Sequence, residues 1–194
     1  GFKHVPLRRE DVLRAHGATP TAAHTLRNCF AQLVLVNLYL GIAIGALDEA
    51  RVYLHREGRP WIAAPVDHAS EDPYTLQRVG ELHVQISAAT ALAERAALSV
   101  QAAYERGEQL TPQERGEAAI AVAEAKVMAH RAGLQAGQEL FEVVGARGTC
   151  ASLGYDRFWR NVRTHTLHDP LDYKLNALGR WALNGELPSP DQYN

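Results

Sequence analysis

The sequence has few aromatic residues and almost no cysteine. Phe, Trp and Tyr together make up 7% of its 194 residues, and the two cysteines are Cys29 and Cys150. Two cysteines cannot build the framework of a disulfide-stapled domain, so we expect a protein of the reducing cytoplasm. The opening stretch GFKHVPLRRE lacks the apolar run that a secretory signal requires, which favours the same location.

An excess of charge of one sign is also lacking. Lys and Arg number 20 against 22 Asp and Glu, whereas proteins that bind nucleic-acid phosphates normally carry a clear basic excess. One uncharged run, residues 28–47, approaches the length of a membrane span. Because Asn28, Gln32 and Asn37 interrupt it, we interpret it as a helix buried on nearly all sides of a bundle. We therefore expect neither nucleic acid nor a membrane as a partner.

Alanine is abundant where aromatic residues are scarce. The chain contains 31 alanines, and 46% of its residues are hydrophobic. Alanine is the best helix former, and its small side chain lets neighbouring helices approach closely. The length fits one domain with a core of its own. The composition therefore favours an all-α fold of closely packed helices.

Proline marks four candidate helix starts. Each of these prolines follows a Thr or an Asp, which would place a capping oxygen just before the first helical residue. The four pairs are Thr19–Pro20, Asp72–Pro73, Thr111–Pro112 and Asp169–Pro170. At the third start Glu114 would complete a capping box with Thr111.

These starts and the glycines that follow them predict three long helices and two shorter ones. The expected ranges are 20–57, 73–106, 112–144, 155–168 and 170–184. Short connections make the long helices antiparallel, so the predicted fold is an up-down bundle of four to five helices. On the second helix, three-and-four spacing predicts an inward stripe of Leu76, Val79, His83, Ile86, Thr90, Ala93, Ala97, Val100 and Tyr104.

Polar side chains that could carry chemistry concentrate in residues 142–170. Two histidines and Asp169 fall within five residues there, but no third ligand of firm spacing accompanies them, so we predict no metal site. Asp169 is explained as the cap of the helix that opens at Pro170. Arg157, Arg160 and Arg163 stand three residues apart. They form either an ion-paired, solvated face or a site for an anion, since guanidinium binds phosphate in a bidentate way.

This segment resembles the C-terminal helical domain of the acyl-CoA dehydrogenase superfamily. In that family a QxxGGxG turn precedes an arginine-rich helix, and the corresponding stretches here are EVVGARG (142–148) and RN (160–161). The stretch RTHTLHDP (163–170) narrows the resemblance to the flavin-dependent monooxygenase branch, which includes dibenzothiophene-desulfurisation and sulfone monooxygenases. Glu142 and Ala146 depart from the dehydrogenase turn, where Gln and Gly stand.

The resemblance implies a reduced-flavin-dependent monooxygenase that acts with O₂ on a small organic substrate containing sulfur or an aromatic ring. It implies FMN or FAD as the cofactor, a flavin reductase as a partner, and a homotetramer. His168 would lie nearest the flavin–oxygen adduct, where an imidazole can donate or accept a hydrogen bond, and His165 would support it. The cofactor-binding residues that it implies are Arg163, Arg160, Gly145, Gly148 and Glu142.

The resemblance further implies that this chain is about half of an enzyme. Residues 1–18 would be the end of a preceding β-domain and a linker, 19–187 the helical bundle, and 188–194 a tail. The family's N-terminal helical domain and middle β-domain do not occur in the chain, so we expect it to be inactive alone.

Two other functions remain open. One is an FAD-dependent, acyl-CoA dehydrogenase-like enzyme, and the other is a non-catalytic helical oligomerisation module. Asp169 stands where some dehydrogenases carry a catalytic Glu, but a carboxylate engaged in capping would be a poor base.

Overall fold

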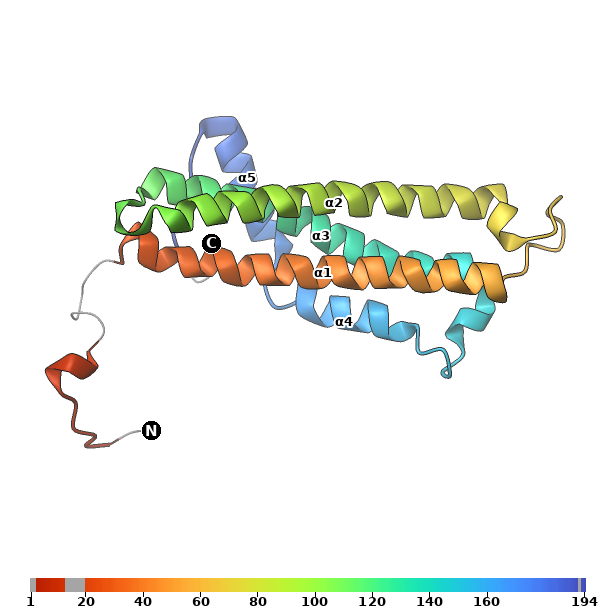
Figure 1. Cartoon of the computed structure of the whole chain (residues 1–194), viewed down its shortest axis with the longest axis horizontal. Helices are drawn as coiled ribbons and strands as arrows, with labels where there is room; N and C mark the ends of the chain where they lie inside the picture. Colours follow the sequence, from red (N-terminus) through yellow and green to blue (C-terminus); the bar gives the residue numbers. More distant parts are fainter. Residues whose placement is uncertain (1–2, 13–19, 192) are drawn as a thin grey trace.

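Three long antiparallel helices form the body of the protein. The computed structural model describes residues 3–12, 20–191, 193 and 194. The long helices are α1 (Ala22–Arg56), α2 (Pro73–Glu105) and α3 (Pro112–Val144), and the shorter α4 (Asp156–Thr166) and α5 (Leu171–Asn184) follow them (Figure 1). Short 3₁₀ helices occupy Arg9–Asp11, Ala69–Glu71, Gly107–Gln109 and Ala146–Thr149. The described residues contain no strand, and the predicted all-α bundle is confirmed.

Two of the four predicted helix caps are confirmed. The side chain of Asp72 accepts hydrogen bonds from two main-chain N–H groups at the start of α2. Thr111 and Glu114 form the predicted capping box at the start of α3. Helix α1 instead begins two residues later than predicted, with Thr21 as its cap, and Thr19 lies outside the described residues.

The prediction that Asp169 caps the last helix is wrong. The residue before α5 is Pro170, and no side chain caps this helix among the described residues. The Asp169 carboxylate points into the bundle instead, where it meets the ammonium group of Lys126. The carboxylate therefore makes a charge-assisted contact with a buried cation in place of the predicted hydrogen bonds to main-chain N–H groups at the start of α5.

The most buried helix is α3 rather than α1. Twenty residues of α3 are buried, and α1, α2, α4 and α5 all pack against it. Helix α1 leaves part of its surface exposed, including Phe30, Val34 and Ile44. By length and composition α1 could cross a membrane, with a mean hydropathy of 2.0 over its most apolar window. The expectation that residues 28–47 are buried on nearly all sides is therefore wrong, because these side chains stay exposed although α2, α3 and α4 pack against α1.

The predicted core stripe of α2 is right for one of its two rows and wrong for the other, in which Leu76 is exposed. Ile86, Ala93 and Val100 are buried as predicted. The second row of buried residues is Leu82, Ala89, Ala96 and Ala103, one position before the predicted row of His83, Thr90, Ala97 and Tyr104. Alanines such as Ala96 and Ala97 stand next to each other, one in the observed row and one in the predicted row. Periodicity alone therefore does not show which of the two rows is buried, and packing against α1 and α3 determines it.

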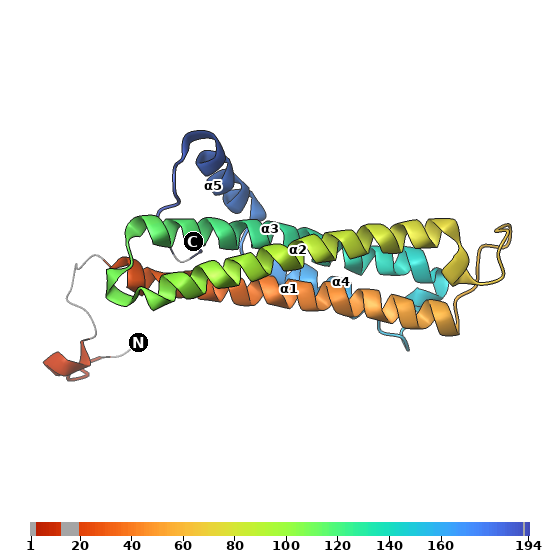
Figure 2. The same ribbon diagram turned by 45° about the horizontal axis from the view of Figure 1, so that its top comes forward.

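Helix α4 lies unusually close to α3, and two glycines make this possible. A Cβ atom on Gly137 would lie 2.9 Å from the Cα of Trp159, and one on Gly133 would lie 2.8 Å from a methyl group of Val162. The chain then leaves α4, and α5 projects away from the long bundle (Figure 2). Residues 167–170, between the two helices, are thus carried on a firmly packed support.

Candidate functional site

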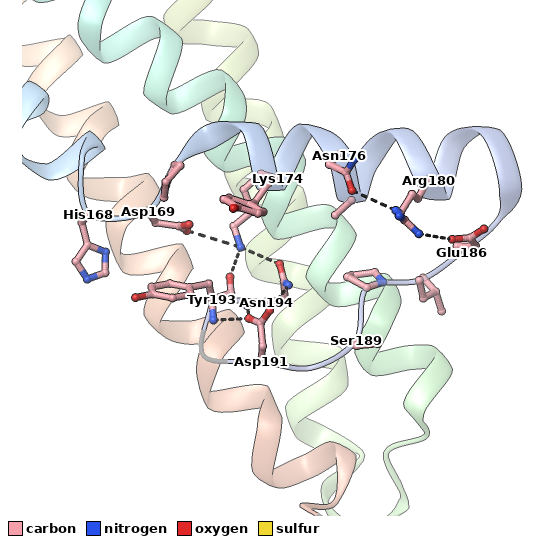
Figure 3. A pocket seen from close by; sticks show the side chains of 15 residues that line it. His168, Asp169, Lys174, Asn176, Arg180, Glu186, Ser189, Asp191, Tyr193 and Asn194 are labelled. Atoms are coloured by element: carbon pink, nitrogen blue, oxygen red, sulfur yellow. Dashed lines mark hydrogen bonds and ion pairs between the residues drawn. The ribbon is translucent and has the colours of Figure 1, made fainter.

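A cavity of about 580 Å³ lies between α5 and the C-terminal segment. Its walls come from residues 168–180 and from residues 186–194, which return toward the long helices (Figure 3). His168 and Tyr193 line the cavity from these two directions. Of the predicted site residues, His168 therefore stands at the edge of this cavity, whereas His165 and Arg163 do not line it.

The His168 side chain is exposed and available to a ligand. Its main-chain N–H donates to the carbonyl oxygen of His165 at 3.1 Å, which completes the last turn after α4. Its imidazole meets the Tyr193 ring edge to face, with centroids 5.9 Å apart. Within the described residues no hydrogen bond occupies its ring nitrogens, so the imidazole can still donate or accept one.

A buried ionic cluster fixes the residue after His168. The Asp169 carboxylate lies 2.5 Å from the Lys126 ammonium group and 3.7 Å from that of Lys174. Lys126 also donates to the side-chain oxygen of Gln32. All three charged side chains are at most 5% exposed. Burial lowers the pKa of both lysines, and the negative charge of Asp169 opposes that shift.

The C-terminal segment is held in place by side chains of the bundle. Lys174 donates to the main-chain oxygen of Tyr193, and also to the side-chain oxygen of Asn194 at 2.9 Å. The fully buried Arg115 donates to the main-chain oxygen of Asn194. Asn28 of α1 donates to the main-chain oxygen of Asp191. Three helices thus hold the segment that carries Tyr193.

His165 occupies a supporting position beside His168. Its main-chain oxygen accepts a hydrogen bond from the Tyr39 hydroxyl at 3.2 Å, and its ring lies edge to face with the Tyr39 ring. Burial, and then the charge of Asp169, raise the pKa of Tyr39 to about 12. His130 packs against the same tyrosine, with ring centroids 6.2 Å apart. Burial, followed by the cations Arg163, Lys126 and Arg131, lowers the pKa of His130.

The arginine row does not act as one group. Arg157 pairs with Glu49 at 2.9 Å, and Arg160 pairs with Asp156 at 3.3 Å on the exposed side of α4. Arg163 is half-buried and lies near enough to His130 to affect its pKa. Of the three, Arg163 is the one without an ion pair among the described residues.

Glu142, Gly145 and Gly148 lie away from His168. Glu142 is exposed and lies 3.8 Å from Arg78 of α2. Gly145 ends α3 with a φ of +73°, a conformation that favours glycine. Helix α4, whose 11 residues rise about 16 Å along its axis, lies between this turn and His168. The structure therefore brings His165, His168 and Arg163 together at one end of α4 and leaves the glycine turn at the other.

Several residues of this site were missed from the sequence. They are the buried cations Arg115, Lys126 and Lys174, together with Gln32 and Tyr193. A sequence signal existed for two of them. Arg115 and Lys126 stand seven residues before and four residues after the apolar Val122, a spacing that places all three on one face of a helix. Lys174 had no such signal, since it is the one buried residue of α5.

Comparison with known proteins identifies relatives that are monooxygenases. The chain is 47% identical over 193 residues to the probable FMNH2-dependent monooxygenase SfnC of Pseudomonas putida, covering 100% of this chain and 49% of that protein. It superimposes on the methanesulfinate monooxygenase MsuC of Pseudomonas fluorescens with a TM-score of 0.89 and 49% identity, covering 92% of this chain and 46% of MsuC.

A third relative is known with ligands bound. It is the dibenzothiophene monooxygenase TdsC of Paenibacillus sp. A11-2, in a complex with FMN and indole, at 43% identity and a TM-score of 0.85. That match covers 89% of this chain and 43% of TdsC. The chain thus spans a little under half the length of each of these relatives.

A family model gives the same result over most of the helical region. The family described as acyl-CoA dehydrogenase, C-terminal domain, matches residues 33–173, which extend from within α1 to the start of α5. The resemblance found in the sequence is confirmed, including its monooxygenase branch. This chain belongs to the acyl-CoA dehydrogenase C-terminal domain family.

Proposed function

We propose that this chain is the C-terminal domain of a reduced-flavin-dependent monooxygenase that acts with O₂ on a small organic sulfur compound. The observation that carries the proposal is the exposed His168 imidazole, which lines a cavity while the next residue, Asp169, is fixed by buried lysines. An imidazole in this position can donate or accept a hydrogen bond to a ligand in the cavity. The monooxygenase relatives support the same reaction class.

The described residues fit a flavin as the bound group. His168 offers an imidazole with free ring nitrogens, and the half-buried Arg163 offers a guanidinium group without an ion pair among the described residues. A flavin mononucleotide needs both kinds of contact, since its ring is polar at the edge and its phosphate is an anion. We propose FMN over FAD, because the relative TdsC is known with FMN.

The bound flavin would supply the redox chemistry and the activation of O₂. His168 would hold a hydrogen bond at the reacting edge of the flavin, and His165 would support the turn that carries His168. Arg163, assisted by Arg160, would meet the phosphate. Glu142, Gly145 and Gly148 stay predicted cofactor contacts, at the other end of α4.

An acyl-CoA dehydrogenase reaction is less well supported. Such a reaction needs a carboxylate free to remove a proton from carbon, and Asp169 is the residue at the corresponding position. Its carboxylate is 5% exposed and is bound by Lys126, and Lys174 lies close by. A buried carboxylate held by two lysines is not free to approach a carbon atom of a substrate.

We also propose a homotetramer, a cytoplasmic location and a separate flavin reductase. Exposed apolar side chains on α1 and α2, such as Val34 and Leu98, would pack against other parts of the full protein or against other subunits. Sedimentation of the full-length protein tests the tetramer, and dependence on an added reductase tests the partner.

The reaction itself is tested with the full-length protein, chemically reduced FMN, O₂ and a panel of sulfinates, sulfones and thiophenes. We expect oxygenated product with wild-type protein and a large loss of product with His168→Ala. Exposed His83 on α2 provides the matched control, and His83→Ala should keep full activity. Reduction of bound flavin by an acyl-CoA without O₂ would instead favour the dehydrogenase.

A further inference from the structure

The ionic cluster at the start of α5 brings two buried lysines to one buried carboxylate. Asp169 carries one negative charge, while Lys126 and Lys174 carry two positive charges, and all three side chains are at most 5% exposed. Either lysine alone would neutralise the carboxylate. A buried charge is costly unless it is paired and hydrogen-bonded, so the second lysine calls for a further role.

The other bonds of Lys174 indicate that role. Its ammonium group donates to the main-chain oxygen of Tyr193 and to the side-chain oxygen of Asn194 (Figure 3). Lys126, in contrast, donates to Gln32 of α1 and to Asp169, and it donates no hydrogen bond to the described residues of the C-terminal segment. Lys174 therefore joins α5 to a segment that lies 19 residues further along the chain.

The two partners of Lys174, Asp169 and Tyr193, both lie next to His168. Asp169 directly follows His168, so fixing its carboxylate fixes the main chain from which the imidazole extends. On the other side, the Tyr193 ring lies edge to face with that imidazole, at 5.9 Å and an interplanar angle of 71°. One ammonium group thus contacts the carboxylate of the residue after His168 and the main-chain oxygen of Tyr193.

We propose that Lys174 is a positioning residue for the flavin site, which acts by holding the Tyr193 ring against the His168 imidazole. Lys126 anchors the same carboxylate to α3, and Tyr193 limits the directions in which His168 can turn. The proposal rests on the proposed function, in which His168 meets the flavin. Displacing a group by about 1 Å near a reacting centre can cost on the order of 100-fold in rate, so such positioning matters.

The kinetic test uses Lys174→Met in the full-length protein. Asp169 keeps Lys126 as its partner, so this variant leaves no unpaired buried charge. We expect kcat with reduced FMN to fall about tenfold while the KM for the sulfur substrate changes little, since the lost positioning acts at the reacting centre. Asp172→Asn removes an exposed charge from the same helix and serves as the control.

Two further variants separate positioning from general stability. Tyr193→Ala should lower kcat as much as Lys174→Met does. Tyr193→Phe keeps the aromatic ring and should retain the wild-type kcat. The double variant Lys174→Met/Tyr193→Ala should be no slower than Tyr193→Ala alone, because both changes break one connection. Losses that multiply in the double variant would overturn the proposal.

Hydrogen exchange tests the positioning role of Lys174 without any measurement of enzyme activity. Hydrogen exchange of the flavin-free protein should rise in residues 167–170 and 188–194 of Lys174→Met, and stay at the wild-type level in Asp172→Asn. Unchanged exchange in both segments would overturn the positioning role. If wild-type protein oxygenates no sulfur compound, the proposed function is wrong, while the exchange data still decide the role of Lys174.

Discussion

The contact between α3 and α4 can be tested by adding a single methyl group. Gly137 lies in the middle of this contact, and a Cβ atom there would lie 2.9 Å from the Cα, 3.1 Å from the main-chain nitrogen and 3.3 Å from the Cβ of Trp159. These are atoms of the α4 main chain and the stem of its side chain, which cannot rotate away. We therefore expect Gly137→Ala to push α4 off α3.

The magnitude follows from two opposing effects. Overpacking of this kind costs about 1–3 kcal/mol, while replacing glycine by alanine inside a helix gains about 1 kcal/mol. Gly80 in α2 provides a control for the second effect, because a Cβ there has nothing within 4 Å. Gly80→Ala should therefore stabilise the protein by about 1 kcal/mol. Gly137→Ala should be less stable than that control by about 1–3 kcal/mol.

Urea denaturation of the two variants, followed by far-ultraviolet circular dichroism, measures this difference directly. For a protein of this size 1 kcal/mol corresponds to roughly 2–4 °C in Tm, so thermal melting gives a second estimate. If Gly137→Ala stabilises the protein as much as Gly80→Ala does, α4 does not lie against α3 as described. The support of the His165–His168 turn would then need another explanation.

Two further predictions concern buried charge. Asp169→Asn leaves the ammonium groups of Lys126 and Lys174 without a carboxylate, and it should lower the free energy of unfolding, measured in urea, by about 3–5 kcal/mol. Lys126→Met leaves Asp169 paired with Lys174 and should lower the free energy of unfolding by less. Equal losses in the two variants would contradict the shared pairing. Burial lowers the pKa of His130 from 6.5, so below pH 6.5 the unfolded chain binds a proton that the folded one rejects, and the free energy of unfolding should fall as the pH falls. His130→Gln should remove part of this slope and His83→Gln, on the exposed face of α2, should not.

Local chemistry was enough to predict the helices. Thr111, Pro112 and Glu114 define the start of α3, and Gly145 defines its end, so the predicted range 112–144 is the observed one. These signals lie within a few residues of the boundary that they set. The capping prediction failed at Asp169 because a distant residue, Lys126, competes for the same carboxylate.

The candidate site was predicted only in part, because some of its residues are distant from one another in the sequence. His165, His168 and Arg163 are close in sequence, and α4 and its last turn keep them close in space. Lys174 and Tyr193 join the site through the return of the C-terminal segment, and no local pattern marks that return. The balance of buried charge also depends on all of these partners at once, so it becomes visible only in three dimensions.

The central claim is that the turn after α4 presents His168 to a flavin. A crystal structure of the full-length protein with oxidised FMN measures this directly. We expect the His168 imidazole to contact the isoalloxazine ring, with the Tyr193 ring still packed edge to face with the imidazole. A flavin bound elsewhere, with His168 facing only solvent or protein, would contradict it.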